Sequence, residues 1–313
     1  MRITNRMMVD TAIQHIAENQ DKISKLQNQV STGKQYQVAS EDPLNASLSL
    51  GLSSNLRTLG SYVETAGNTK DWMNATEFSM DQLETIATRA STLLLQGAND
   101  TLSDKDRASS LGIEMRDLLS QAIDVGNTKH NDQYIFAGYK VKTKPFVLEN
   151  DTTQPTYNDF LGNTGVYPKM ITYNGDSGTM QRSLAPDQNV PLNINGDQAI
   201  KDFLKNLAFA SEALVKNPKD SASLQTALGG LQSSLDTLSR YRTSNGTRLR
   251  QVETAGEYLD QVTIETKSLL SKKQDVNIAE AIALLSNQKN TYQAALEVSS
   301  RAISALSLFD YMQ

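Results

Sequence analysis

The side chains that could bind a metal or transfer protons are few, and their spacing suits neither task. His15 and His130 are the two histidines of the chain, which contains no cysteine. A zinc site needs three or four ligands that converge, so we expect no metal. Glu41 and Asp42 could form an acid–base pair. They directly precede Pro43, however, and are better explained as a cap at the start of a helix.

Other motifs that would indicate chemistry are also missing. Asn193, Asn195 and Asp197 resemble part of a calcium loop, but the glutamate that should end such a loop is not in register. A turn that caps the next helix is the favoured interpretation. The sequence contains no phosphate-binding loop, dinucleotide fingerprint or nucleophile elbow. We therefore expect no cofactor and no enzymatic activity.

Composition argues against several classes of partner. The 313 residues include 30 Lys and Arg and 35 Asp and Glu, a net charge of −5, and the basic residues are scattered. No basic patch is available for nucleic acid or for an anionic membrane. No apolar run approaches the ~18 residues of a membrane span. Asp10 interrupts the region where a cleaved signal peptide would need an apolar core, so export would have to proceed without one.

Apolar residues recur at alternating steps of four and three near both ends of the chain, which predicts two coiled-coil helices. The first stripe stops at Ser31, Thr32 and Gly33, and the second continues almost to the last residue. Burying each Leu or Ile is worth ~1.5 to 3 kcal/mol, so these stripes need partners. They could pair within one molecule, or pair and then pack against other subunits in a ring or filament. The predicted assembly interface comprises Val9, Ile13, Ile16, Ile23, Val30, Ile278, Ile282, Leu285, Tyr292, Leu296, Ile303, Leu306 and Phe309.

Between the ends, helical patterns flank a segment rich in β-formers, glycine and proline. A helix is predicted from Pro43, and a polar break near Asn99 predicts an antiparallel helical hairpin. Asn174–Gly175 predicts a tight β-hairpin turn. Helices resume at Asp197, and Asn245–Gly246 could break the last of them before the C-terminal helix.

The predicted fold class is mainly α with a β-rich insertion, an elongated helical coiled-coil rod built from the N- and C-terminal helices. Five parts are expected. They are 1–42, a coiled-coil helix with its exit loop; 43–133, a helical rod; 134–196, the β-rich insertion with its leading strand pair; 197–272, the returning helices of the rod; and 273–313, the C-terminal coiled-coil helix.

Three segments resemble the bacterial flagellin family. Residues 23–43 read ISKLQNQVSTGKQYQVASEDP, similar to the family pattern of a leucine-bearing helix, a Ser-Thr-Gly turn and an acidic step before proline. Residues 131–146 read NDQYIFAGYKVKTKPF, like the first strand pair of the family's hook-filament junction members, which flagellins proper do not usually share. Residues 279–312 resemble the family's C-terminal helix and end in the Ser-Leu-Phe-Asp-Tyr typical of the junction members. The resemblance covers most of the chain outside 149–195.

The resemblance implies a structural subunit of the bacterial flagellum that joins hook to filament. Its terminal helices would form an inner layer, and the β-rich insertion would face outward. Implied partners are copies of the chain itself in a ring or helical layer, hook-associated protein 1 on the hook side, flagellin on the filament side, and an export chaperone on the C-terminal helix. Implied localisation is extracellular, after type III export. A flagellin that forms the filament itself and an intracellular coiled-coil adaptor stay open as alternatives.

Overall fold

The computed structural model describes residues 2–99, 103–149, 157–158, 164–165, 170–216 and 220–311. For residues 2–6, 8–9, 157–158, 164–165, 170 and 302–311 it describes the backbone alone. The chain divides into two units: unit 1 comprises Met1–Leu59 and Gln261–Gln313, and unit 2 comprises Gly60–Asp260. The long helices α2 (Pro43–Gly97) and α7 (Ser221–Gln274) contribute residues to both units.

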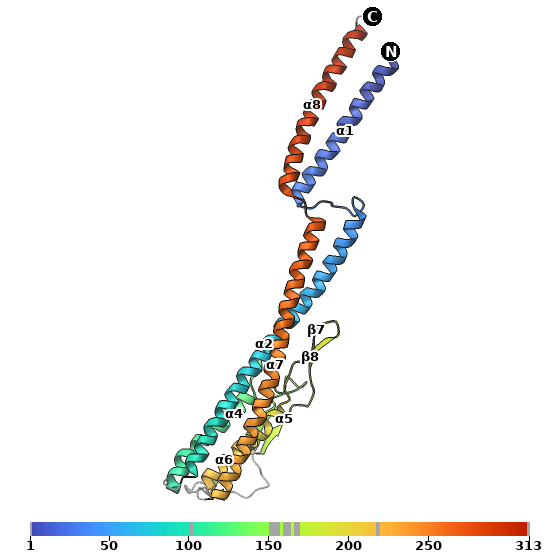
Figure 1. Cartoon of the computed structure of the whole chain (residues 1–313). Helices are drawn as coiled ribbons and strands as arrows, with labels where there is room; N and C mark the ends of the chain where they lie inside the picture. Colours follow the sequence, from blue (N-terminus) through green and yellow to red (C-terminus); the bar gives the residue numbers. More distant parts are fainter. Residues whose placement is uncertain are drawn as a thin grey trace. The chain divides into compact units, whose positions relative to one another are not determined.

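Unit 1 contains the two terminal helices, α1 (Arg2–Thr32) and α8 (Ile278–Tyr311), which lie side by side in Figure 1. α1 ends where the sequence predicts, because Gly33 adopts a φ of 69°, which favours glycine at the end of a helix. α2 begins at Pro43, also as predicted. The Asn45 backbone N–H donates to Asp42 Oδ1 at 3.0 Å, so Asp42 caps this helix.

The loop between α1 and α2 is held by hydrogen bonds within unit 1. The Val276 backbone N–H, just before α8, donates to the Gly33 carbonyl oxygen at 2.9 Å. Tyr36 is buried, and its hydroxyl lies 2.7 Å from Ser49 Oγ and 2.9 Å from the Asn45 carbonyl oxygen. These contacts fix the point from which the two terminal helices run alongside each other.

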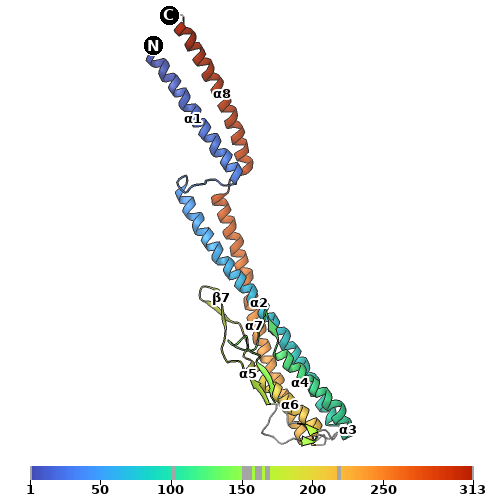
Figure 2. The same ribbon diagram turned by 180° about the vertical axis from the view of Figure 1, so that it is seen from behind.

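Unit 2 packs α4 (Gly112–Gly126) and α6 (Lys201–Lys216) against α2 and α7, as Figure 2 shows. Shorter helical segments are α3 (Asp104–Asp106), a π-helical turn η1 (Arg107–Leu111) and α5 (Gly196–Ala199). Trp72 is buried in the core. The core also contains Met80, Leu83, Met115, Phe136, Phe146, Phe203, Leu207, Leu231 and Leu238.

The strands that the structure describes, the first of which begin before residue 134, form two-stranded antiparallel pairs. The pairs are β1 (Lys129–His130) with β2 (Gln133–Tyr134), β3 (Phe146–Glu149) with β6 (Met170–Tyr173), β4 (Tyr157–Asn158) with β5 (Thr164–Gly165), and β7 (Gln181–Ala185) with β8 (Gln188–Pro191). The mainly helical fold class with a strand-containing insertion is therefore confirmed.

The predicted hairpin turn at Asn174–Gly175 is wrong. The strand before it, β6, pairs with β3, and the Asn174 N–H donates to the Pro145 carbonyl oxygen at 2.8 Å. A Cβ at Gly175 would lie 2.4 Å from the Tyr173 ring and 2.9 Å from the Ala137 carbonyl oxygen, so this glycine permits close packing. The β7–β8 hairpin instead turns beside Asp187, whose φ is 65°.

The pair Asn245–Gly246 does not break its helix, because α7 is continuous from Ser221 to Gln274. Asn245 is buried, and its side-chain amide donates to the Met73 carbonyl oxygen of α2 at 3.0 Å. The neighbouring helix thus gives the asparagine a partner in the middle of α7.

Candidate assembly surface

α1 and α8 pack against each other in antiparallel orientation. Gly33 lies opposite Val276 at one end of the pair, and Gln288 Nε2 donates to Asn19 Oδ1 at 2.7 Å farther along. Extending this register places Ile23 at the level of Leu285. Pairing of the two ends within one molecule, one of the two arrangements expected from the sequence, is present.

The buried seam of this helix pair coincides with part of the predicted interface. It comprises Ala12, Ile16, Asn19, Ile23, Leu26 and Val30 on α1, and Ala281, Leu285, Gln288, Tyr292, Ala295 and Ser299 on α8, all half-buried except Ala281, which is buried. Sequence reasoning passed over Ala281 because a search for large apolar side chains favours Ile282 beside it, and passed over Gln288 because its side chain is polar. The sequence signal that could have found both residues is the alternating spacing of three and four that they share with the other seam residues of α8.

Other members of the predicted interface stay exposed on the flanks of the seam. Ile13 is 57% exposed, Ile278 49%, Ile282 51% and Leu296 41%. The side chains of Val9, Ile303, Leu306 and Phe309 lie outside the described part of the structure. The predicted residues therefore fall into two groups, one that pairs α1 with α8 and one that the pair leaves uncovered.

Unit 1 exposes further apolar side chains that the sequence analysis missed. Leu284 and Val298 lie on α8, at positions outside both the seam and the predicted stripe. For α2 the signal was available in the closely spaced leucines at the start of the helix, which reads PLNASLSLGL. The additional exposed residues are Met7, Val38, Leu44, Leu48, Leu50, Ile264, Leu269, Leu284 and Val298.

The two units differ in how much apolar surface they bury. Both hydrophobic clusters draw their members from unit 2. Among the residues whose side chains are described in unit 1, the buried hydrophobic ones are Tyr36 and Ala281. A set of exposed leucines and isoleucines of this size is characteristic of surfaces that bind other proteins.

The titratable residues singled out by the sequence make only local contacts. His15 is exposed and lies 3.5 Å from Glu18 Oε2, and the His130 ring meets Trp72 edge to face, with centroids 5.9 Å apart. Backbone and side-chain hydrogen bonds from Asn45 lower the pKa of Asp42 below its ordinary value. The described residues contain no group of three or more histidines and carboxylates that could hold a metal.

The asparagine-rich segment before α5 is a helix cap, as the sequence predicted. Asn195 Oδ1 accepts the Asp197 backbone N–H at 2.9 Å, so it closes the start of α5. Asn193 instead bridges backbone groups of the insertion: its Oδ1 accepts the Met180 N–H, and its Nδ2 donates to the Gly178 carbonyl oxygen. Both side chains are used in local structure.

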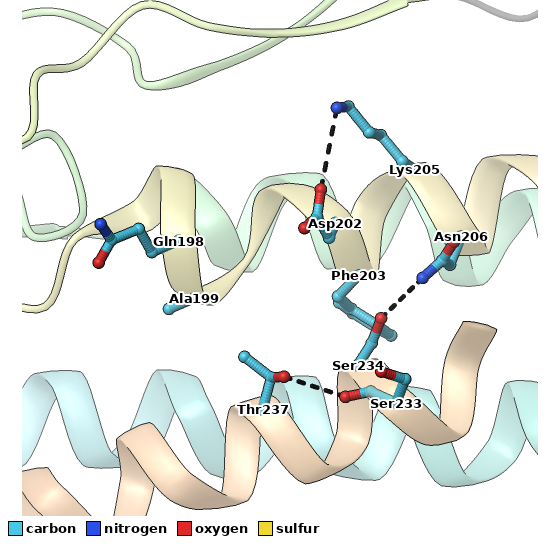
Figure 3. Close-up of a pocket in the computed structure, with 9 residues that line it drawn as sticks. All are labelled: Gln198, Ala199, Asp202, Phe203, Lys205, Asn206, Ser233, Ser234 and Thr237. Atoms are coloured by element: carbon cyan, nitrogen blue, oxygen red, sulfur yellow. Dashed lines mark hydrogen bonds and ion pairs between the residues drawn. The ribbon is translucent and has the colours of Figure 1, made fainter. Parts of the chain in front are cut away.

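An open pocket of about 310 Å³ lies between α5, α6 and α7 in unit 2 (Figure 3). Asn206 Nδ2 donates to Ser234 Oγ at 2.9 Å across it, and Lys205 Nζ lies 3.8 Å from Asp202 Oδ1. No residue drawn there pairs a nucleophile with a base. The pocket is a polar groove between packed helices.

Among the described residues, no helix is long and apolar enough to cross a membrane.

Comparison with known proteins defines the class. Residues 3–141 match the family model described as "Bacterial flagellin N-terminal helical region", a span that includes α1, all of α2 and the first strand pair. The chain thus carries a flagellin-type N-terminal region. Over 99% of both chains it is also 27% identical to "Flagellar hook-associated protein 3" of Salmonella typhimurium. The chain is a full-length homologue of flagellar hook-associated protein 3, as its sequence motifs indicated.

Two further comparisons refine this result. A flagellin of Clostridium tyrobutyricum is 25% identical, but the similarity covers 45% of this chain and 37% of that flagellin. The crystal structure of FlgL from Bacillus cereus has a TM-score of 0.58 at 22% identity, covering 71% of this chain and 99% of that one. The fold is therefore that of FlgL structures, and the full-length similarity favours hook-associated protein 3 over flagellin.

Proposed function

We propose that this protein is a structural subunit that joins the flagellar hook to the filament. The observation that carries the proposal is the uncovered apolar surface of unit 1, in a chain whose full-length homologue is named for the hook. Partners on that surface would be copies of the same chain in a ring or helical layer, hook-associated protein 1 on the hook side and flagellin on the filament side. The mechanism is assembly, with no turnover.

The assembly interface contains two kinds of residue in this proposal. Ile16, Ile23, Val30, Leu285 and Tyr292 join the terminal helices within one subunit. The contacts to neighbouring subunits come from Val9, Ile13, Ile278, Ile282, Leu296, Ile303, Leu306 and Phe309. This division follows from burial for the residues whose side chains are described, since a half-buried residue has less surface left for a second partner.

The same surface creates a need for protection before assembly. α8 exposes Ile278, Ile282 and Leu296 together with Leu284 and Val298. Exposed apolar helices are prone to aggregate, so a chaperone that covers α8 until export would keep the subunit available. We propose export without a cleaved signal peptide and an extracellular location on the flagellum. The terminal parts 1–42 and 273–313 would form the inner layer, 43–133 and 197–272 the helical rod, and 134–196 the outer insertion.

Deletion of the gene tests this function against its two rivals. A junction subunit predicts cells with hooks but no filaments, and flagellin lost unassembled to the medium. The flagellin alternative, which the match to the flagellin N-terminal region supports, predicts missing filaments without unassembled flagellin outside the cell. An intracellular adaptor predicts filaments of normal length. Complementation with the intact gene should restore filaments in the first case.

A further inference from the structure

A polar cluster interrupts the apolar contact between α2 and α7 in unit 2. Asn245 of α7 is 1% exposed, and its Nδ2 donates to the Met73 carbonyl oxygen at 3.0 Å and to Glu77 Oε2 at 3.3 Å. Met73 is itself completely buried. Burying a side-chain amide destabilises the folded protein unless the amide finds hydrogen-bond partners. For Asn245 those partners lie on α2, so the two helices must keep the same relative position along their length.

Arg242, one turn earlier on α7, binds three carboxylates of α2. Its Nε lies 2.6 Å from Glu77 Oε1, one terminal nitrogen 2.8 Å from Asp81 Oδ1, and the other 2.6 Å from Glu84 Oε2. Hydrogen bonds with Glu77 and Glu84 raise the pKa of Arg242. Ser239 Oγ adds a contact to Glu84 Oε1 at 2.7 Å. The carboxylates follow one face of α2 at spacings of four and three.

Outside the polar cluster, Lys70 of α2 and Glu253 of α7 form a partly exposed ion pair at 3.0 Å, and the apolar part of the contact between these helices does not select one register. On α2 it presents Met73, Met80 and Leu83, and on α7 it presents Leu238, Val252 and Leu259, all at helical spacing. Such residues can exchange positions after a shift of one turn, because leucine and methionine adapt to one another. Gly246 adds no constraint, since a Cβ built there has no atom within 4 Å.

A shift of one turn would disrupt the polar cluster in either direction. Moving Arg242 toward Met73 places the guanidinium against a buried thioether and removes it from Glu84. Moving it the other way takes Asn245 from the Met73 carbonyl oxygen. A buried polar side chain such as Asn245 fixes register in coiled coils.

We propose that Asn245 and Arg242, with Glu77, Asp81 and Glu84, form a register lock that holds α7 at one longitudinal position along α2 and excludes the position one turn away. The apolar residues supply most of the affinity between the helices. The register lock determines which longitudinal position α7 takes along α2.

Disulfide trapping tests the lock directly, because the chain has no cysteine of its own. A Cβ built on Gly256 lies 4.0 Å from Ala66 Cβ, within the range of a disulfide. The Ala66→Cys/Gly256→Cys pair therefore reports the observed register. Ala66→Cys/Asp260→Cys and Tyr62→Cys/Gly256→Cys report shifts of one turn in the two directions. Each pair is placed in the full chain and oxidised, and the cross-linked peptides are quantified by mass spectrometry.

With Arg242 and Asn245 intact, we expect the Ala66–Gly256 pair to cross-link and the two shifted pairs to stay at background. In the Arg242→Met/Asn245→Leu background, cross-linking of at least one shifted pair should rise by about tenfold or more. The control background Arg250→Met/Asn74→Leu changes exposed residues of the same types and should leave the pattern unaltered.

Shifted pairs that stay at background in the Arg242→Met/Asn245→Leu chain would overturn the proposal, since the apolar residues alone would then fix the register. If that double variant loses its helical circular dichroism signal, the single variants Asn245→Leu and Arg242→Gln carry the same comparison. Background cross-linking of the shifted pairs in those variants would overturn it equally.

Discussion

At the scale of single residues, Gly112 lies at a close approach between α4 and α6. A Cβ at this position would lie 2.5 Å from Val215 Cγ2, and valine is stiff about its first side-chain torsion. Gly60, in α2, has no atom within 4 Å of the corresponding point. The two helical glycines therefore differ in their surroundings, which makes them a matched pair for mutation.

Gly112→Ala should destabilise the protein. Overpacking costs about 1–3 kcal/mol, which exceeds the ~1 kcal/mol that alanine gains over glycine in a helix. Gly60→Ala, the control, should raise stability by about 0.5–1 kcal/mol. Denaturant unfolding followed by circular dichroism measures both. Equal effects of the two substitutions would show that Val215 moves aside at little cost.

Asp42 caps the start of α2, and its protonation makes the stability of the protein depend on pH. The pKa of Asp42 in the folded protein lies below 3.8 because the carboxylate accepts hydrogen bonds from Asn45. The stability that this cap contributes is therefore present above pH 3.8 and is lost as the pH falls through the folded pKa. Asp42→Ala should lower the melting temperature at pH 7, and the difference should shrink as pH falls below about 4. Asp21→Ala, in the exposed interior of α1, removes a carboxylate away from any helix start and is the control. A difference independent of pH would argue against capping.

At the scale of elements, the sequence predicted the terminal helices well because three-four spacing, a Gly33 stop and a proline start are local signals. It did not predict which face of each stripe the partner helix would cover. Ala281 and Gln288 lie in the seam while Ile282 is exposed, and that choice depends on the register of α8 against α1. The sequence also did not predict that β3 pairs with β6, since the two strands are distant in the sequence.

The two groups of interface residues should separate by mutation. Ile282→Asp should leave the helical signal of the free chain unchanged and abolish filament attachment, because Ile282 is exposed in the α1–α8 pair. Leu285→Asp should reduce both the helical signal and filament attachment, since it also removes ~1.5 to 3 kcal/mol of apolar burial within the α1–α8 pair. Circular dichroism and a motility assay provide the two measurements. Asn287→Asp, another exposed change to aspartate on α8, is the control, and normal attachment with Ile282→Asp would contradict the assignment.

At the scale of the whole molecule, the hydrophobic core and the proposed assembly surface belong to different units. Unit 2 has the hydrophobic clusters, and unit 1 contains the α1–α8 pair with its narrow seam together with the start of α2 and the end of α7. Isolated helices are only marginally stable in water, so unit 1 should gain much of its stability on assembly. In the free chain, amide hydrogens of α1 and α8 should exchange faster than those of α4 and α6. Equal protection in hydrogen exchange would show that unit 1 is stable alone.

The central claim is a position in the flagellum, and immunogold electron microscopy tests it most directly. An antibody against the insertion between Glu149 and Asn195 is applied to intact cells and detached flagella. The account predicts label confined to the boundary between hook and filament. Label along the whole filament, or label found only inside cells, would contradict it.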